Sequence, residues 1–380
     1  MPRAGEEWGD LTQRRRDAEE CERFNASGIS CYPVKKSRER QRRREAEEWE
    51  TFNAEAQRRR AAEKMSDLSE RIKGGGFAVT AEITPPCGPD PERIKGIASM
   101  LKGKVHGLVV EECFAGVHMS SLAAAVHLKT MGAAPVVTML TRDANRIGLQ
   151  SALLGVVSLG ISDVLVLSGH HQALTSERQA RGVYDVDSTQ AIGVFRSMRD
   201  RIADWGLGNN AEAQRRKEEN NFDGVTPPRA ASKKAEITLG GAANPFAGPI
   251  PLRALRVAKK IKAGADFIVT QPVFDLPRFR EWLDLLRGRG VPERVCLIAG
   301  IMWLASASQA RELNETYRGM NIPEGVIHRL SQSADGEREG LLIAAEMVEQ
   351  VRSLSGVRGI HLWARDREES LPELLDSAKL

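Results

Sequence analysis

FAVTAEITPP, residues 77–86, is the stretch of sequence that decides the fold. Its side chains alternate as they do along a β-strand, which has two faces. One face carries Phe77, Val79, Ala81 and Ile83, and the other carries Ala78, Thr80 and Glu82. Pro85 and Pro86 end the strand because neither can donate to a sheet ladder. The stretch therefore predicts a strand that holds one carboxylate, Glu82, at its carboxyl end.

Short runs of β-branched residues recur after this strand and alternate with amphipathic stretches. The predicted strands are Phe77–Ile83, Gly107–Glu111, Pro135–Leu140, Asp163–Leu167, Glu236–Gly240, Asp266–Thr270, Val295–Ala299 and Arg358–Leu362. The predicted helices between them include Ser120–Met131, Arg146–Leu159, Thr189–Ala203, Leu252–Ala263 and Glu337–Leu354. Such alternation is typical of a parallel sheet with helices outside it.

Glycines punctuate the predicted helices, since Gly132, Gly160, Gly206 and Gly264 fall where a left-handed C-cap is expected. Eight strand–helix units favour a (β/α)8 TIM barrel of the α/β class over a doubly wound sheet. A doubly wound nucleotide-binding sheet would also have a GxGxxG turn after its first strand, and the sequence has none there.

Polar residues and glycines follow the predicted strands, and in a TIM barrel the carboxyl ends of the strands meet at one mouth. The residues expected there are Glu82, Glu111 or Glu112, Thr138 to Arg142, Ser168, Gly169, His170, Asn244, Gln271, Gly300 and Trp363. The strand interiors, by contrast, are Val, Ile, Leu and Ala. The pattern predicts a binding site at the barrel mouth.

Composition excludes several classes of protein. The chain has 380 residues, of which 41% are hydrophobic. Its formal charge of +4 comes from acidic and basic residues interspersed along the chain, and such a charge pattern does not indicate nucleic-acid binding. No apolar run approaches the ~20 residues that span a membrane, and no signal peptide is evident. Five cysteines without a CxxC pair favour neither disulfides nor a structural metal site. We expect a cytoplasmic protein without a metal.

Residues 1–64 differ from the rest, with 16 Lys and Arg and 14 Asp and Glu. QRRRDAEECERFNA (Gln13–Ala26) recurs as QRRREAEEWETFNA (Gln41–Ala54), but the copies lack the apolar face that a solenoid core requires. We interpret this segment as a low-complexity charged arm, disordered or helical and without a function of its own. Met65 precedes the first strand and resembles a natural start.

Four motifs in this order resemble the methylenetetrahydrofolate reductase family, with greatest similarity to its bacterial branch. They are AEITPP at the first strand, TRDANRIGLQSALLGVVSLGISDVLVLSG (Thr141–Gly169), AANPFAGP (Ala242–Pro249) and GADFIVTQPVFD (Gly264–Asp275). The resemblance covers about residues 77–363. Relative to the family, residues 209–234 resemble an insertion, so that one reductase barrel is expected over residues 65–380.

The resemblance implies a reaction. Family members use NAD(P)H and a non-covalent FAD to reduce 5,10-methylenetetrahydrofolate to 5-methyltetrahydrofolate, in one-carbon metabolism and methionine biosynthesis. The resemblance is also compatible with a chain that forms a homo-oligomer or that binds a partner subunit of the one-carbon pathway. Two alternatives stay open: a degenerate folate- or flavin-binding subunit of a methyl-transfer complex, and a pterin-dependent methyltransferase barrel.

The resemblance also implies roles for particular residues. Glu82 is the expected catalytic acid, which suits a carboxyl whose pKa is raised by desolvation. Gln271 matches the glutamine that binds the folate, and an amide offers the pterin edge both a donor and an acceptor. The flavin-binding positions are Gly169, His170, Tyr184, Asn244 and Lys260, with Lys259 as an alternative to Lys260.

Three positions depart from the family pattern. GHHQ stands where relatives have GDHQ, so His170 replaces an aspartate beside the flavin. Val136 stands at a third-strand position that is often His or Gln, and Glu111 or Glu112 occupies a turn where relatives carry threonine. A neutral or cationic His170 is expected to raise the flavin potential.

Overall fold

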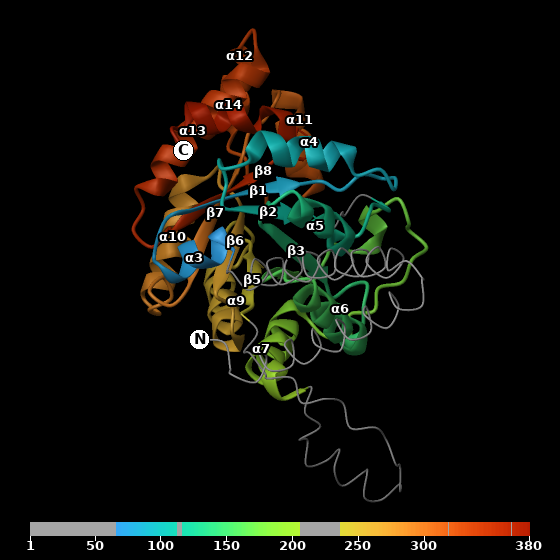
Figure 1. Ribbon diagram of the computed structural model, residues 1–380. Helices are drawn as coiled ribbons and strands as arrows, with labels where there is room; N and C mark the ends of the chain where they lie inside the picture. Colours follow the sequence, from blue (N-terminus) through green and yellow to red (C-terminus); the bar gives the residue numbers. More distant parts are fainter. Residues whose placement is uncertain (1–65, 112–115, 206–235, 318, 366) are drawn as a thin grey trace, which may run out of the picture. The chain divides into compact units, whose positions relative to one another are not determined.

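The computed structural model describes residues 66–111, 116–205, 236–317, 319–365 and 367–380. The predicted arm, Gly206 and the predicted insertion all lie outside these residues. Parallel strands close into a barrel in the order β1 to β8 (Figure 1). The strands are β1 Ala78–Ile83, β2 Gly107–Val110, β3 Pro135–Leu140, β4 Asp163–Leu167, β5 Thr238–Ala243, β6 Phe267–Pro272, β7 Cys296–Met302 and β8 Gly359–Trp363. The predicted (β/α)8 barrel is confirmed.

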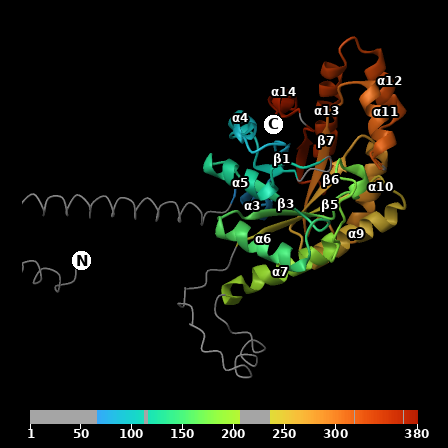
Figure 2. The same ribbon diagram turned by 90° about the vertical axis from the view of Figure 1, so that its right-hand side faces the viewer.

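Helices surround the barrel, and Figure 2 shows them from the side. They are α3 Asp67–Lys73, α4 Glu92–Leu101, α5 Ser121–Thr130, α6 Arg146–Ser158, α7 Ser188–Trp205, α9 Ile250–Ala263, α10 Leu276–Arg287, α11 Ala307–Thr316, α12 Glu324–Gln332, α13 Gly336–Arg352 and α14 Leu371–Ser377, with short 3-10 turns η1 Gln172–Leu174 and η2 Glu368–Ser370. The glycines after α5, α6 and α9 have positive φ, as predicted for Gly132, Gly160 and Gly264.

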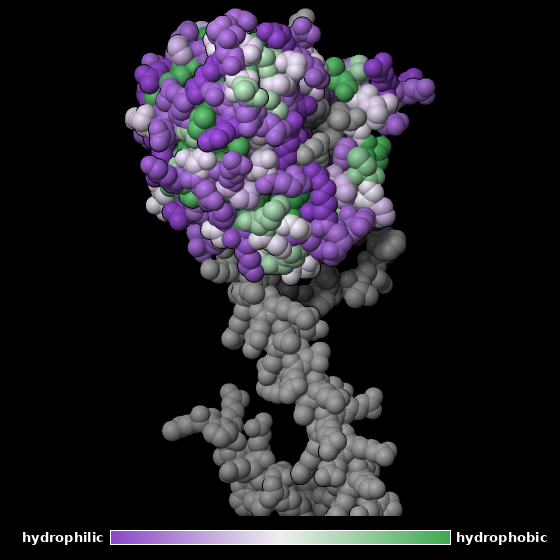
Figure 3. Space-filling model, turned by 90° about the horizontal axis from the view of Figure 1, so that it is seen from above, coloured by the Kyte–Doolittle hydropathy of each residue, from purple (hydrophilic) through white to green (hydrophobic). Residues whose placement is uncertain are grey.

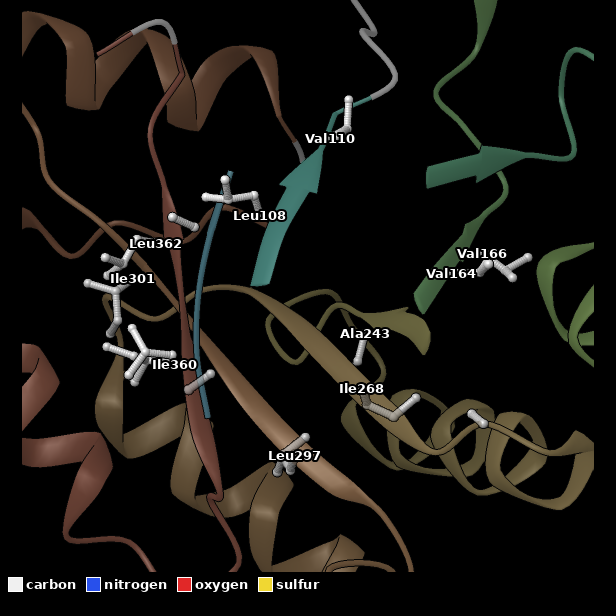
Figure 4. Packing of buried hydrophobic residues seen from close by; sticks show 14 of the residues in the cluster. Leu108, Val110, Val164, Val166, Ala243, Ile268, Leu297, Ile301, Ile360 and Leu362 are labelled. Carbon is white, nitrogen blue, oxygen red and sulfur yellow. The ribbon is translucent and has the colours of Figure 1, made fainter. Parts of the chain in front are cut away.

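Strand alternation sorts the core into two layers. The outward side chains pack under the helices, and Figure 4 shows part of this layer, including Leu108 on β2, Val164 on β4 and Ile360 on β8. On the face seen in Figure 3 the described surface is mostly hydrophilic, with small scattered hydrophobic patches. Apolar side chains are thus concentrated inside the barrel and between the strands and helices.

Helix α3 closes the base of the barrel. Ser66 caps it by accepting the Ser69 N–H at 3.0 Å, and Leu68 and Ile72 reach the interior layer that contains Val136. Ser69 Oγ donates to the buried Asp163 carboxylate at 2.7 Å, and Ser66 Oγ donates to it as well. This small helix, which carries few apolar residues, forms the floor of the barrel.

Four strands end later than predicted. β5, β6, β7 and β8 end at Ala243, Pro272, Met302 and Trp363, and β5 also begins later than predicted, at Thr238. Glycine in a strand weakens the pattern by which a strand is predicted from sequence. In β5, Gly240 leaves space for the Phe267 ring inside the barrel, because a Cβ on Gly240 would lie 2.2 Å from that ring.

Candidate functional site

A cavity of about 980 Å³ opens at the carboxyl ends of the strands, and we call it the mouth cavity. Among the residues predicted for the mouth, those that line it are Glu82, Glu111, Thr138, Leu140, Arg142, Ser168, Gly169, His170, Asn244, Gln271 and Trp363. Gly300 is not among the lining residues, and Glu112 lies outside the described residues. The strand ends therefore converge on one pocket, as the alternation predicted.

Glu82 is buried inside the barrel, with 2% of its surface exposed. Its Oε1 accepts the backbone N–H of Arg365 at 3.2 Å. Burial raises the pKa of Glu82 well above its usual range, and the nearby Glu111 carboxylate raises it further, while the Arg365 N–H opposes the shift. Val79, Ala81 and Ile83 of β1 face outward, so the barrel interior supplies the desolvation of Glu82.

Glu111 enters the same cavity from the adjacent strand. Glu82 is paired with Val109 of β2, and Glu111, which follows the last residue of β2, lines the cavity two positions beyond Val109. The backbone N–H of Glu111 donates to Ile83 O at 3.0 Å, which ties this residue to the end of β1. The cavity thus has an acidic end, formed by two carboxylates on neighbouring strands.

The Arg365 side chain contacts Tyr317. Its guanidinium lies 5.1 Å from the centre of the Tyr317 ring, and its Nη2 donates to the Tyr317 hydroxyl at 3.4 Å. The Tyr317 ring in turn meets the His170 ring edge to face, with 6.1 Å between centroids. These contacts join the acidic end of the cavity to the turn after β4.

His170 occupies that turn beside Gly169, whose φ of +80° is the left-handed conformation that glycine favours. A Cβ on Gly169 would lie 3.0 Å from Arg142 Cβ, so the turn also needs the small residue. Arg142 donates to His170 O at 3.1 Å. Partial desolvation lowers the pKa of His170, and Arg142 and Arg365 lower it further. The ring is therefore neutral at pH 7, and the cationic alternative is not favoured.

The opposite end of the cavity is cationic. Arg253, Arg256, Lys259 and Lys260 of α9 line it, and Asp187 lies nearby. Lys260 is half-buried and donates to Ala242 O at 2.7 Å, whereas Lys259 is exposed. Burial lowers the pKa of Lys260 to about 8. Of the two lysines that the sequence could not separate, Lys260 is the one held against the barrel.

The remaining predicted residues differ in their placement. Gln271 is half-buried in the cavity wall. Asn244 lines the cavity too, but its Oδ1 accepts the N–H groups of Phe246 and Ala247 at 3.0 and 3.1 Å and so closes a turn. Tyr184 is not among the lining residues. It has a φ of +44°, and its hydroxyl donates to His170 O at 3.4 Å, so it supports the turn from outside.

Val136 does not take part in the mouth cavity. It is fully buried in the interior layer beside α3, and Thr138, two residues along the same strand, lines the cavity instead. Val136 therefore lies one inward-facing position closer to the base of the barrel than the residue of β3 that lines the cavity.

Sequence reasoning missed several residues of the site, among them His361, Tyr317 and Arg365. His361 shares an inward face with Trp363, so strand parity could have identified it. Its Nδ1 lies 3.0 Å from Thr80 Oγ1, and burial lowers its pKa to about 3. Tyr317 and Arg365 lie in loop and helix-end positions, where no periodic signal exists.

Known proteins resemble part of this chain in sequence. Residues 250–379 match the family model described as methylenetetrahydrofolate reductase. Methylenetetrahydrofolate reductase 1 of Schizosaccharomyces pombe is 28% identical over 125 residues, which is 31% of this chain. The match covers 19% of that relative's length.

A solved structure shares the fold. The protein from Clostridium thermocellum described as binding two copies of 5-methyl-5,6,7,8-tetrahydrofolic acid aligns with a TM-score of 0.56 and 15% identity. The alignment covers 82% of this chain and 98% of that one. In the described part of the chain no helix is both long and apolar enough to cross a membrane. The predicted resemblance to the methylenetetrahydrofolate reductase family is confirmed as a similarity, which the family model finds over residues 250–379.

Proposed function

We propose that this chain is a flavin-dependent reductase that converts 5,10-methylenetetrahydrofolate into 5-methyltetrahydrofolate with electrons from NAD(P)H. The observation that carries the proposal is Glu82, a buried carboxyl with a raised pKa inside a large cavity. A carboxyl that stays protonated near neutral pH can act as a general acid. The family match favours this reaction over others that a TIM barrel supports.

The residues of the cavity fit FAD. The volume of about 980 Å³ is at the upper end of the range for ligand pockets. Arg256 and Lys260 at the cationic end would hold the phosphates, and the Gly169–His170 turn would lie beside the flavin ring. When bound, FAD would supply the hydride for the one-carbon unit of the folate.

The chain's own residues would handle the proton and the substrate. Glu82 would give a proton to N10 of the folate as the imidazolidine ring opens. Gln271 would bind the pterin edge through its amide. Trp363 and Met302, which also line the cavity, would limit access of water to the acid.

Purified protein tests the proposal. We expect a yellow protein whose flavin is bleached by NADH or NADPH without oxygen and is restored by methylenetetrahydrofolate. Bound flavin with no folate turnover would instead support the degenerate subunit, for which the neutral His170 and the added Glu111 are the supporting observations. A colourless protein that still binds folate would support the methyltransferase alternative.

Glu111→Gln is expected to lower the pH at which folate turnover falls. Burial raises the pKa of Glu82 most, and the Glu111 charge adds to it, while Glu368 also raises it and Arg365 lowers it. Only protonated Glu82 donates, so turnover is lost as pH rises through its pKa. Removing the Glu111 charge lowers that pKa and moves the loss to lower pH. The pH profile of kcat measures this shift.

Asp187→Asn is the matched control for Glu111→Gln. It removes one negative charge from the cationic end of the same cavity, next to Lys260. We expect it to leave the alkaline limb of the profile in place. Equal shifts in both variants would contradict a specific action of Glu111 on Glu82.

His170→Asp is expected to lower the potential of bound flavin. The native ring is neutral at pH 7 because its pKa is lowered, so the substitution adds a negative charge that opposes charge on the reduced flavin. For a two-electron couple ~30 mV corresponds to about 1.4 kcal/mol, so a shift of tens of millivolts is expected. Potentiometric titration measures this shift. In the native protein the flavin potential should gain extra pH dependence only below about pH 6.5, the usual pKa of histidine.

The control is His171→Asp, which makes the same charge change one residue further along. His171 does not line the mouth cavity, and its Nδ1 accepts the Ala173 N–H at 3.2 Å. Identical potentials in the His170→Asp and His171→Asp proteins would mean that His170 does not face the flavin.

A further inference from the structure

A second cavity, of about 590 Å³, lies at the opposite end of the barrel from Glu82, and we call it the basal pocket. It is formed by α7, the end of α9 and the segments that precede β6 and β7. Its charged lining residues are Arg196, Arg199, Lys262, Asp266, Arg289 and Arg294. Asp266 and Arg294 come just before the strands β6 and β7 begin, which places the pocket at the amino ends of the strands.

Positive charge in the basal pocket exceeds negative charge. Asp266, the one lining acid among the described residues, is already engaged, since it accepts Arg199 Nη1 at 2.7 Å and the Leu239 N–H at 2.8 Å. Arg196 lies 3.8 Å from Asp200 at the edge. For Lys262, Arg289 and Arg294, the described part of the chain offers no carboxylate within ion-pair distance. Three cations therefore face the pocket without an opposing charge.

Several of the arginines are held in place by the backbone. Arg196 lies across Gly264, where a Cβ would be 2.5 Å from Arg196 Cδ, and its Nη1 donates to Lys262 O at 3.2 Å. Arg289 Nη1 donates to Leu285 O at 2.8 Å. A bond to a carbonyl fixes the guanidinium but leaves its charge and its other N–H groups available. The arginines are thus oriented before any ligand arrives.

The wall between these cations is apolar, formed in part by Ile261 and Val291. A guanidinium binds phosphate through two parallel hydrogen bonds, and an apolar wall suits a flat ring. The volume falls in the range of small-molecule pockets. An ordinary solvated helix face would instead alternate opposite charges along its length.

We propose that the basal pocket binds a small phosphate-bearing ligand of nucleotide size, with the phosphates on the arginines and the ring against Ile261 and Val291. The site is separate from the mouth cavity and shares no lining residue with it. The proposal therefore does not depend on the reaction that the mouth cavity performs.

Calorimetric titration of the full chain with ATP and with inorganic tripolyphosphate tests the proposal at low and moderate salt. We expect saturable ATP binding that tripolyphosphate displaces. The double variant Arg196→Gln/Arg294→Gln, which removes one cation from each side of the pocket, should bind ATP at least tenfold more weakly. The matched control is Arg311→Gln/Arg338→Gln, because both arginines are exposed on other helices, α11 and α13.

A third protein, Arg256→Gln, locates the bound ATP. Arg256 lines the mouth cavity, so a loss of affinity there with none in Arg196→Gln/Arg294→Gln would place ATP in the mouth cavity and overturn the proposal. Failure of ATP to bind saturably, or an equal loss in the Arg311→Gln/Arg338→Gln control, would overturn it as well. Tighter binding of a hexaglutamate peptide than of ATP would show that the pocket receives an acidic protein segment instead.

Discussion

Glu82→Gln is expected to reduce turnover of methylenetetrahydrofolate by about 10²- to 10⁴-fold, the usual contribution of a general acid. Glutamine has nearly the same shape and can still accept the Arg365 N–H, but it has no carboxyl proton to give. Flavin binding and flavin reduction by NAD(P)H should be unchanged, since neither needs the acid. Separate measurement of the NAD(P)H and folate half-reactions detects this difference.

Glu82→Asp is the companion variant, because it keeps an acid on a shorter side chain and should retain part of the turnover. Wild-type folate turnover in Glu82→Gln would show that another group supplies the proton, and Glu111 would be the first candidate. Loss of both half-reactions would instead point to a damaged cavity, which the melting temperature of the variant would reveal.

The position of Glu82 could be predicted from the sequence because strand geometry is local. A period of two places Ala78, Thr80 and Glu82 on one side of β1, and the prolines mark the end. The same rule applied to β8 would have found His361 from Trp363. Parity has a limit at Val136, since alternation identifies the inward face but not the depth of a residue within the barrel.

The acidic end of the cavity was only partly predictable. The sequence gives Glu111 or Glu112 as alternatives, and Glu111, the one of the two that the structure describes, lines the mouth cavity. The contacts of Arg365 with Tyr317, and of Tyr317 with His170, join residues far apart in the sequence. Such contacts depend on how loops are placed by the closed barrel, which no local pattern encodes.

The same limit applies to α3. Seven residues with a charged majority, DLSERIK, give little reason to expect a core element. Yet Leu68 is fully buried, Ile72 is 8% exposed, and the serines before and within the helix reach Asp163. A closed barrel has an open base that must be filled, and that requirement arises only from the complete fold.

Removal of α3 is expected to have the largest effect on stability. A chain that begins at Met65 keeps the helix, and we expect it to melt with the full-length protein. A chain that begins at Gly76 loses the burial of Leu68 and Ile72, each worth about 2–5 kcal/mol if truncated to alanine. The sum is comparable to the total stability of a domain, about 5–15 kcal/mol. Thermal unfolding should therefore show a fall of ten degrees or more, or an insoluble protein.

Point variants keep this prediction testable if the chain from Gly76 does not fold. Leu68→Ala should lower the free energy of unfolding by about 2–5 kcal/mol, because it opens a cavity in the floor of the barrel. Glu70→Ala, at an exposed position of the same helix, should change it by no more than about 0.5 kcal/mol. If the chain from Gly76 melted together with the chain from Met65, α3 would be an accessory to a barrel that is stable without a floor. Its contacts with Asp163 would then contribute little, even though both serines reach that buried carboxylate.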